Sequence, residues 1–373
     1  MTTLRVILDE MHDSGSVGRY TSELTREIIR TAPVGCFVEG FVSASTEEQY
    51  ASILERLPGL AYLHKSPLAS REMRAAWQHG FTRLPGSGMV HAPSPLAPLA
   101  RHDRLNGGDQ IVVTFHDTLA WTHPEVLRGR TVTWYKSMAK RAEKYADAVV
   151  VPSHTVAEEL TELVGFAGRI RVISPAPSST ITVPPDADVR AARLGLPERY
   201  VLAWGGPESR TGIDTLVGAL SHIDSSVPLL LVGPEADDAT LADLVSESGL
   251  ESQRARGLGN LDDRDLAVVI DRATVFAYPN VEEGFGMPML EAFALGTPVV
   301  HSDAPALLEL AAEAGIAVAR DDDGYPERLA DAITRVLTDD ELASRLKYSG
   351  LDRARMFSWR SAAEKVWQLH ADL

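Results

Sequence analysis

The feature that most constrains the fold of this chain is a regular alternation of short apolar runs with amphipathic segments. The apolar runs have the length of buried strands and lie at residues 4–8, 111–115, 148–151, 201–204, 229–232, 275–278 and 298–300. Helical periodicity marks the segments between them, at residues 20–31, 131–145, 156–163, 215–223, 266–272, 289–295 and 325–337. Short apolar strands separated by helices are typical of parallel sheets that helices cover on both faces. The sequence therefore predicts an α/β protein with doubly wound, Rossmann-like sheets.

The length of 373 residues suggests two domains, at about 150 residues per domain. Four prolines within residues 174–186 interrupt the periodicity, which is typical of a linker. We predict one domain over residues 1–180 and a second over 187–355, with a last helix within 356–373. Thr155 and Glu158 have the spacing of a capping box, which predicts a helix start after the strand at 148–151. Two such domains that face each other would form a cleft at the carboxyl ends of their strands, where these sheets bind ligands.

The overall composition excludes several classes of protein. The formal net charge is −16, which argues against a nucleic-acid binder with an overall basic surface. Cys36 is the single cysteine, so a disulfide framework and a thiolate metal cluster are excluded, and a reducing cytoplasm fits. No apolar run approaches the roughly 18 residues of a membrane span. Because the N-terminus also enters a strand-like run directly, we expect an intracellular, cytoplasmic protein.

The charge is distributed unevenly along the chain. Residues 1–178 hold 19 basic and 19 acidic side chains, whereas residues 179–373 hold 17 basic and 33 acidic ones. Two stretches of the neutral half are locally basic, at 65–83 and 128–144. Two interpretations stay open: these are solvated helix faces, or they form a surface that meets an anionic acceptor or the inner leaflet of an anionic membrane.

The most informative segment of the chain follows the strand at 275–278. A strand that ends near Pro279 is followed by a glycine-rich turn, and Pro288 fits the first position of a helix that Gly296 ends. The N-terminus of that helix suits a diphosphate, because its N–H groups are free and its dipole is positive there. Glu283 on the turn and Glu291, expected in the first helical turn, can both accept hydrogen bonds from sugar hydroxyls.

This segment resembles the hallmark of the retaining glycosyltransferases of family 4, which have the GT-B fold. The hallmark, Glu-Gly-Phe-Gly-x-Pro-x-x-Glu-Ala, is matched from Glu283 to Ala292. Four further segments agree with the family pattern and follow one another in the same order as in the family. They are residues 14–20, 114–117, 151–153 and 357–359. The resemblance covers most of the chain. It implies an N-terminal domain that takes the acceptor, a C-terminal domain that takes a nucleotide-activated sugar, and a last helix that crosses back onto the first domain.

The resemblance also implies roles for individual residues in the second domain. Glu291 matches the glutamate that accepts hydrogen bonds from the ribose hydroxyls of the donor. Glu283 matches the glutamate that contacts the donor sugar. The backbone of the neighbouring residues matches the part of the family segment that binds the donor; these residues are Gly284, Phe285, Gly286 and Met287. The alternative for Glu291 is a carboxylate that only interacts with the helix dipole.

Three residues of the first domain receive roles in the same way. Gly15 and Gly18 match a loop after the first strand that approaches the diphosphate and the acceptor. His116 matches a histidine close to the transferred sugar. The alternatives are a simple turn for the two glycines and a core histidine for His116.

One segment, at residues 204–212, departs from the family pattern. Gly205 or Gly206 stands where the family has an arginine, and Thr211 stands where it has a lysine. Those cations hold the diphosphate and stabilise charge on the leaving group. Arg210 is the remaining cation of the segment and the candidate for this catalytic role.

From these observations we expect a hexosyl transfer from a nucleoside-diphosphate sugar to a hydroxyl acceptor, with retained anomeric configuration. The resemblance implies front-face attack with the donor phosphate oxygen as base. We expect no cofactor and no metal, and we interpret Asp321, Asp322 and Asp323 as a solvated loop. The acceptor class stays open between a glycan, a lipid-linked and a small-molecule acceptor. Two alternatives remain: a catalytically weak GT-B subunit that binds a nucleotide sugar or supports a partner enzyme, and a GT-B sugar-nucleotide epimerase.

Overall fold

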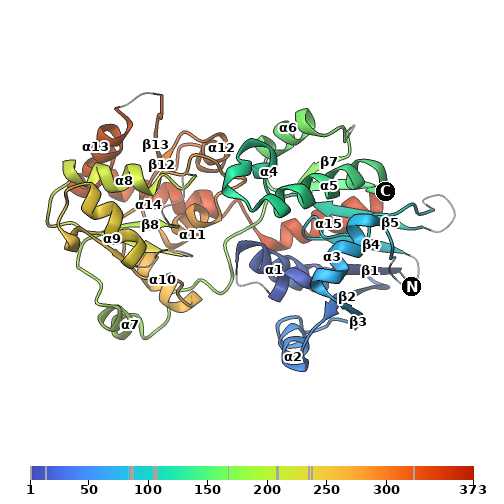
Figure 1. Cartoon of the computed structure of the whole chain (residues 1–373). Coiled ribbons are helices and arrows are strands. Elements are labelled where there is room, and N and C mark those ends of the chain that lie inside the picture. The colour runs from blue at the N-terminus through green and yellow to red at the C-terminus, as the bar shows by residue number, and fades with distance from the viewer. Residues whose placement is uncertain are drawn as a thin grey trace. The chain divides into compact units, whose positions relative to one another are not determined.

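A computed structural model of the chain describes residues 2–12, 15–82, 84, 88–103, 108–166, 168–206, 210–233, 236, 238–321 and 324–373. The chain divides into two compact units (Figure 1). Unit 1 consists of Met1–Pro175 and Ser358–Leu373, and unit 2 consists of Ala176–Phe357. The division after Pro175 falls inside the proline-containing segment 174–186, a few residues before the predicted end of the first domain at residue 180.

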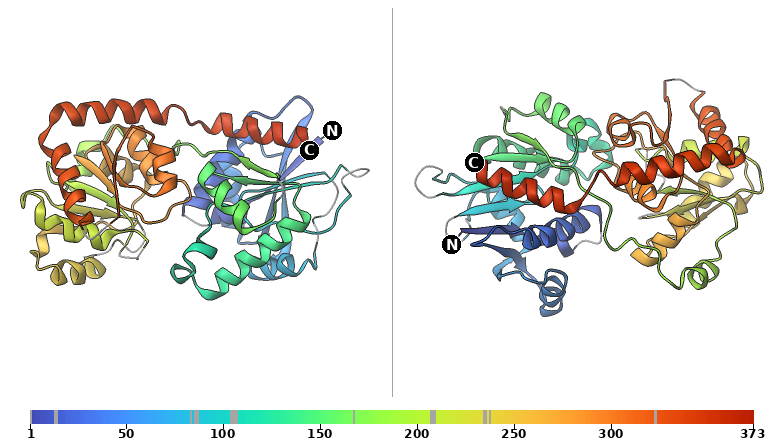
Figure 2. Two further views of the ribbon diagram at one scale, coloured as in Figure 1. Left: turned by 90° about the horizontal axis from the view of Figure 1, so that it is seen from above. Right: turned by 180° about the vertical axis from the view of Figure 1, so that it is seen from behind.

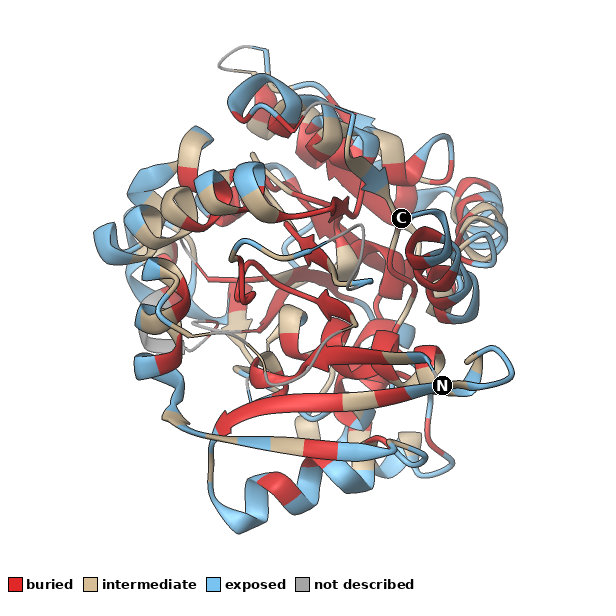
Figure 3. Ribbon diagram, turned by 90° about the vertical axis from the view of Figure 1, so that its right-hand side faces the viewer, coloured by how far each residue is buried: buried red, intermediate tan, exposed pale blue. Residues whose placement is uncertain are grey.

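Unit 1 is built on a parallel sheet of seven strands in the order β3-β2-β1-β4-β5-β6-β7. The strands are β1 (Thr2–Ile7), β2 (Cys36–Ala44), β3 (Tyr62–Ala69), β4 (Met89–Ala92), β5 (Gln110–Thr114), β6 (Ala148–Val151) and β7 (Ile170–Val172). All four residues of β6 are buried, as expected for a strand that helices cover on both faces. In Figure 3 buried residues follow the strands, whereas the helices turn exposed faces outward.

The helices of unit 1 include one from the far end of the chain. They are α1 (Ser16–Arg30), α2 (Glu47–Arg56), α3 (Ser70–His79), α4 (Leu119–Thr122), α5 (Gly129–Tyr145), α6 (His154–Leu163) and α15 (Trp359–Asp372), with 3-10 turns η1 (Asp9–His12) and η2 (Pro124–Val126). The last helix, α15, lies beside α1 (Figure 2), where the Trp367 indole Nε1 donates to the carbonyl oxygen of Ile28 over 3.0 Å. The ring of Trp359 also packs edge-on against Tyr20, with centroids 5.5 Å apart.

Unit 2 repeats the architecture with six parallel strands in the order β10-β9-β8-β11-β12-β13. The strands are β8 (Val201–Trp204), β9 (Leu229–Val232), β10 (Ala255–Gly257), β11 (Val275–Tyr278), β12 (Val299–Ser302) and β13 (Ile316–Val318). Its helices are α7 (Ala187–Leu194), α8 (Ile213–Ala219), α9 (Asp238–Glu247), α10 (Asp263–Asp271), α11 (Met287–Leu295), α12 (Pro305–Ala311), α13 (Tyr325–Thr338) and α14 (Asp340–Ala354), with 3-10 turns η3 (Leu220–His222) and η4 (Ser252–Arg254).

The predicted fold class, two doubly wound Rossmann-like sheets, is confirmed, and each predicted strand exists to within two residues at either end. The predicted capping box is wrong. Helix α6 begins at His154, because the Ser153 hydroxyl accepts the N–H of Val156 and makes Ser153 the N-cap. Thr155 therefore lies inside the helix.

In each sheet, the order reverses between two adjacent strands. These are β1 and β4 in unit 1, and β8 and β11 in unit 2. Open parallel sheets bind ligands outside the carboxyl ends of their strands at such a reversal. We call this side of each sheet its carboxyl edge. Among the described residues, no helix combines the length and the apolar character that crossing a bilayer requires.

Candidate functional site

The carboxyl edge of unit 2 is formed by the loops that follow β8 and β11. The two loops are joined, because the backbone N–H of Val281 donates to the carbonyl oxygen of Arg210 over 2.8 Å. Gly212 adopts a positive φ of 64°, and a Cβ there would lie 2.5 Å from the carbonyl oxygen of Pro279. Only glycine permits this close approach of the two loops.

Glu283 projects from the loop after β11 and has one oxygen of its carboxylate fixed by two donors. The hydroxyl of Tyr278 donates to Oε2 over 2.8 Å, and the side-chain amide of Asn280 donates to the same Oε2 over 3.0 Å. Tyr278 and Asn280 are 2% and 3% exposed, whereas Glu283 is half-buried. The carboxylate is thus held in one orientation at the end of β11.

Tyr278 remains protonated and acts as a permanent donor. Burial raises its pKa well above the ordinary value, and the negative charge of Glu283 beside it raises it further. The positive charge of Arg210 opposes this shift, and Glu291 adds to it. Arg210, Glu283 and Glu291 therefore all lie close enough to Tyr278 to influence one proton, although they are far apart in the sequence.

The start of helix α11 corrects two predictions. Gly286 is the N-cap, with φ of 94°, and a Cβ there would lie 2.7 Å from Leu307 Cδ2. The helix begins at Met287, so Pro288 is its second residue rather than its first. Glu291 is the fifth residue of the helix and lies in its second turn, so its predicted place in the first turn is wrong; it is 2% exposed. Gly296 ends the helix in the left-handed conformation, with φ of 77°.

Residues that the sequence analysis did not single out hold the loop after β11. The Arg320 guanidinium donates to the carbonyl oxygen of Val281 over 2.8 Å and pairs with Asp303 over 2.6 Å. The Ser302 hydroxyl donates to the carbonyl oxygen of Asn280 over 2.5 Å. Ser302 ends β12, so its place at the same edge follows from the strand pattern; the contact of Arg320 depends on the tertiary structure.

The segment that departs from the family pattern packs tightly at the end of β8. Thr211 is 4% exposed, and its hydroxyl donates to the carbonyl oxygen of Gly206 over 2.7 Å. Gly205 has φ of 108°, and a Cβ there would lie 3.1 Å from Thr211 Cγ2. Arg210 is half-buried. Pro207, Glu208 and Ser209 lie outside the described residues.

In unit 1 the predicted glycines lie at the start of α1. Gly15 is the N-cap of this helix and its carbonyl oxygen accepts the N–H of Arg19 over 3.1 Å. Gly18 is buried in the first turn. Ser14, the first residue of the predicted loop, lies outside the described residues. The helix start therefore faces the same edge of the sheet as the end of β1.

His116 follows β5 at the carboxyl edge of unit 1. Its Nε2 lies 2.7 Å from the carbonyl oxygen of Pro93, and its ring packs edge-on against Tyr20 of α1, with centroids 4.7 Å apart. Because a carbonyl only accepts, Nε2 bears the proton. Burial lowers the pKa of His116 to about 4, although the hydrogen bond to Pro93 acts in the opposite direction. At neutral pH His116 is a neutral imidazole with Nδ1 as an acceptor.

Further polar side chains of unit 1 contact one another near the end of β1. Glu10, after β1, accepts from Arg74 and from the hydroxyl of Ser94, each over 3.1 Å. Arg74 also lies over the ring of Trp134, 4.8 Å from the centroid. Asp9 is 7% exposed and accepts the N–H of Ser43 over 3.2 Å. These groups could bind a hydroxyl-bearing molecule.

The two basic stretches differ in what their side chains contact. In the first, Lys65 pairs with Glu47 over 3.4 Å and Arg74 pairs with Glu10, so both are used within the unit. Arg83 lies outside the described residues. The second stretch coincides with α5 and its N-cap, and it exposes Arg128, Arg130, Lys140 and Lys144.

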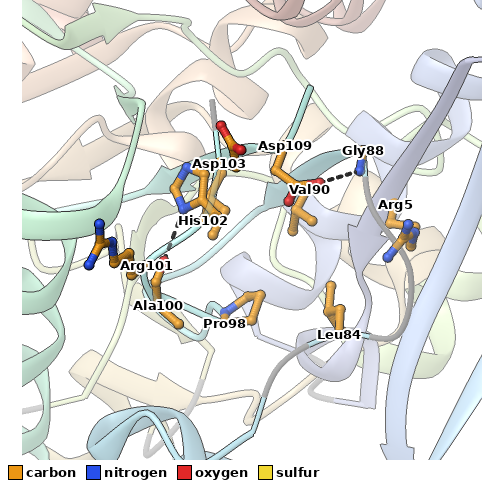
Figure 4. A pocket seen from close by; sticks show the side chains of 11 residues that line it. Arg5, Leu84, Gly88, Val90, Pro98, Ala100, Arg101, His102, Asp103 and Asp109 are labelled. Carbon is orange, nitrogen blue, oxygen red and sulfur yellow. Dashed lines mark hydrogen bonds between the residues drawn. The ribbon is translucent and has the colours of Figure 1, made fainter. Parts of the chain in front are cut away.

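A cavity of about 610 Å³ in unit 1 lies away from this edge (Figure 4). Its walls include Arg5, Gly88, Arg101, His102 and Asp109. Gly88 and Asp109 precede β4 and β5, so the cavity lies where these strands begin. It is therefore at the opposite end of the strands from His116.

Within the described part of the chain, no group of three or more His, Cys, Asp or Glu side chains could hold a metal ion. Asp321 is exposed and pairs with Arg328 over 2.8 Å. Asp322 and Asp323 lie outside the described residues.

Comparisons with known proteins identify the family of the chain. A family model described as Glycosyltransferase Family 4 matches residues 17–176, and one described as Glycosyl transferases group 1 matches residues 198–339. The O-antigen chain mannosyltransferase B of Escherichia coli is 27% identical over 374 residues, covering 94% of this chain and 94% of that protein.

Solved structures share the fold of the whole chain. Sucrose-phosphate synthase from Thermosynechococcus elongatus is similar with a TM-score of 0.73 at 23% identity, covering 100% of this chain and 99% of that chain. HepE of Anabaena, in complex with UDP and glucose, is similar with a TM-score of 0.75 at 18% identity, covering 100% of both chains. With one model matched in each unit and this fold throughout, the chain belongs to the family 4 glycosyltransferases and has the GT-B fold.

Proposed function

We propose that this glycosyltransferase moves a hexosyl group from a nucleoside-diphosphate sugar to a hydroxyl acceptor with retention of configuration and without a metal ion. The main support is the environment of Glu283. Its carboxylate is fixed by Tyr278 and Asn280 at the carboxyl edge of unit 2, next to the start of α11. A fixed carboxylate beside free helix N–H groups suits a ligand that bears both sugar hydroxyls and a diphosphate.

In this proposal unit 2 binds the donor. Glu291 accepts hydrogen bonds from the ribose hydroxyls, and Glu283 accepts them from the transferred sugar. The backbone of Gly284, Phe285, Gly286 and Met287 approaches the diphosphate. The solved structures of HepE with UDP and glucose and with UDP-glucose support a donor of this class.

Unit 1 then binds the acceptor, a glycan, a lipid-linked or a small molecule. His116, neutral and with Nδ1 as an acceptor, contacts the transferred sugar or the acceptor hydroxyl, and the backbone at Gly15 and Gly18 approaches the diphosphate and the acceptor. The exposed arginine and lysine side chains of α5 and its N-cap would then face an anionic acceptor or the cytoplasmic leaflet of an anionic membrane. A nucleic-acid partner is not proposed, because the net charge is −16.

The proposed chemistry is a front-face displacement. The bond between the anomeric carbon and the phosphate oxygen breaks, the acceptor oxygen bonds to the same face, and its proton passes to the departing phosphate oxygen. The protein orients the two substrates and stabilises the growing negative charge with Arg210 and the start of α11. A chelator tests the proposed independence of metal: most turnover should survive excess EDTA, and loss that Mg²⁺ or Mn²⁺ restores would contradict it.

A second candidate function is a weak or inactive GT-B subunit that binds a nucleotide sugar. The observation in its favour is that Gly205 or Gly206 stands at the arginine position of the family pattern and Thr211 stands at its lysine position. A third, an epimerase, would share the fold without the segment from Glu283 to Glu291.

A thermal-shift screen of nucleotide sugars followed by a turnover assay separates these candidates, since binding raises apparent stability by mass action. The proposal expects both a shift and turnover with acceptor. A shift without turnover favours the weak subunit, and isomerised donor without acceptor identifies the epimerase.

A further inference from the structure

The segment at residues 357–359, which agrees with the family pattern, has an aromatic side chain at each end. Phe357 is the last residue of unit 2, and Ser358 begins the part of unit 1 that the end of the chain supplies. The function proposed above gives no role to Phe357 or to Trp359. Each of the two rings packs against a residue of its own unit, and both contacts lead to residues of the candidate site.

Trp359 reaches the candidate site of unit 1 through one intermediate ring. It is the first residue of α15 and is 7% exposed. Its ring packs edge-on against Tyr20, with centroids 5.5 Å apart, and the ring of Tyr20 packs edge-on against His116, with centroids 4.7 Å apart. Such pairs are favourable beyond the area that they bury, because the positive edge of one ring meets the negative face of the other.

The orientation of the His116 ring depends on this packing. Its Nε2 donates to the carbonyl oxygen of Pro93 over 2.7 Å. One hydrogen bond fixes Nε2 but lets the ring turn about the bond, and the contact with Tyr20 opposes that rotation. Tyr20 is 6% exposed, and Trp359 packs against it. The direction of Nδ1, the acceptor atom of His116, therefore depends on Trp359 through Tyr20.

Phe357 makes a corresponding contact in unit 2. Its ring packs edge-on against Phe285, with centroids 5.7 Å apart, and the Arg353 guanidinium lies over the Phe357 ring, 5.1 Å from the centroid. Arg353 in turn donates to the carbonyl oxygen of Leu310 over 2.7 Å. Phe285 is 7% exposed and directly precedes Gly286, the N-cap of α11. Phe357 thus supports the turn at residues 284–287, whose backbone is proposed to approach the diphosphate.

We propose that Trp359 and Phe357 are positioning residues for the transfer reaction: Trp359 orients His116 through Tyr20, and Phe357 orients Phe285. This inference rests on the proposed function, which assigns His116 and the turn at residues 284–287 to the substrates. Neither aromatic side chain of the tail touches a substrate in this proposal. Because each ring acts within its own unit, the two roles can be tested separately.

Trp359→Ala should release Tyr20 and, with it, the ring of His116. Burial lowers the pKa of His116 to about 4, so a ring that turns toward solvent should titrate closer to the ordinary value of 6.5. NMR titration of the histidine ring protons measures this pKa, and the signal that His116→Gln removes identifies His116. Trp359→Phe keeps an aromatic ring and should keep the wild-type pKa. Nucleotide affinity should stay within about twofold in both variants, since sites that share no partner are usually independent.

Trp367→Ala is the matched control for Trp359→Ala. Trp367 belongs to the same helix, is 8% exposed, and donates through its indole to the carbonyl oxygen of Ile28 over 3.0 Å. The control should destabilise unit 1 in a similar way and leave the pKa of His116 unchanged. Trp359→Leu is the second variant if Trp359→Ala folds poorly, because it keeps an apolar side chain without a ring. An equal rise of the His116 pKa in the Trp367 control would overturn the role of Trp359.

Phe357→Ala should weaken the binding of nucleotides. Isothermal titration with UDP, UDP-glucose, GDP and GDP-mannose should show a loss of about three- to tenfold, as expected for one aromatic pair. The free diphosphate and the nucleotide sugar should lose affinity equally, because the turn is proposed to approach the diphosphate that both contain. Phe357→Tyr keeps the ring and should bind as the wild type does. Met356→Ala, at an exposed neighbour, is the control.

The outcomes distinguish this inference from the proposed function. A wild-type protein that binds neither nucleotide sugars nor nucleoside diphosphates contradicts the proposed function, whereas the pKa of His116 still tests Trp359. A wild-type protein that binds them, with folded Trp359→Ala and Phe357→Ala variants that keep the wild-type pKa and affinities, overturns only this inference. A single variant that changes both measurements also overturns it, because the two rings would then not act separately.

Discussion

At the carboxyl edge of unit 2, burial and hydrogen bonds determine the protonation state of Tyr278 and the orientation of Glu283. Tyr278 keeps its proton because burial and the charge of Glu283 both oppose ionisation. Glu283, in turn, has one oxygen bound and one available. Arg210 lies close enough to Tyr278 for its positive charge to oppose this rise in pKa.

The first prediction at this scale concerns Arg210. A cation aimed at the leaving diphosphate stabilises the transition state more than the ground state. Arg210→Ala should therefore lower the turnover number by about two to three powers of ten, as when one aimed donor is removed elsewhere. Arg345→Ala, an exposed arginine of α14, is the control and should have no effect. Turnover within twofold of wild type would show that Arg210 takes no part in the reaction.

A second prediction concerns Glu291, which is 2% exposed in the second turn of α11. Its proposed partners are ribose hydroxyls, which are present in the free diphosphate as well as in the nucleotide sugar. Glu291→Ala should weaken the binding of both by about ten- to hundredfold, since a hydrogen bond to a charged group contributes roughly 1.5–3 kcal/mol. Titration with UDP and UDP-glucose measures this. Unchanged affinity in a folded variant would contradict the assignment of Glu291 to the ribose hydroxyls.

At the scale of elements, the start of α11 shows how one residue places a helix. Gly286 combines a positive φ with a contact that leaves no room for a Cβ. The lack of room arises because α12 packs against the turn through Leu307 and Leu310. The turn brings Glu283 to the end of β11 and directs the first N–H groups of α11 to the same edge.

The prediction at this scale is that Gly286→Ala destabilises unit 2. A Cβ would lie 2.7 Å from Leu307 Cδ2 at φ of 94°, so the free energy of unfolding should fall by about 1–3 kcal/mol. Gly218→Ala, in α8, is the matched control. Nothing lies within 4 Å of its Cβ position, so a helix-forming residue should be neutral or stabilising there. Urea unfolding of both variants tests this, and equal stability would contradict it.

At the scale of the whole molecule, helix α15 returns from the end of the chain and packs on unit 1 through two buried histidines. His91 of β4 is fully buried, with both ring nitrogens unpartnered among the described residues. His370 of α15 is 3% exposed, and the two ring centroids are 5.8 Å apart. Burial lowers the pKa of His91 to about 4 and, together with His91, lowers that of His370 to about 3.

These shifts predict that unit 1 loses stability in acid. Both pKa values are lower in the folded chain than the ordinary 6.5, so the unfolded chain binds more protons below pH 6.5. The contribution of the two neutral histidines to the free energy of unfolding is fully present above pH 6.5 and is lost as the pH falls toward 4. When the pH is lowered from 7.5 to 5, the free energy of unfolding should fall by about 2 kcal/mol for each of the two histidines. His91→Leu should reduce this acid sensitivity in urea unfolding. The same pH dependence in wild type and variant would refute the explanation.

Several strands could not be predicted from the sequence pattern, and each has a physical reason. The short strands β7 and β13 have only three residues each, too few for a pattern. Strand β3 lies at the edge of its sheet, contains Pro67 and has a single buried residue, Leu63, so it does not resemble a buried strand. Strand β4 contains His91, a polar residue that is fully buried.

The fold class and the segment from Glu283 to Glu291 could be predicted from the sequence, because both depend on local order: short apolar runs between helices, and a glycine-rich turn before a helix. The sequence could not determine the shell around Glu283. Tyr278 and Asn280 look like the end of a strand, and Arg320 like a surface base. They meet because the parallel sheet brings the ends of β11, β12 and β13 to one edge. Tertiary structure also decided the neutral state of His116, since burial, which no local pattern encodes, lowers its pKa.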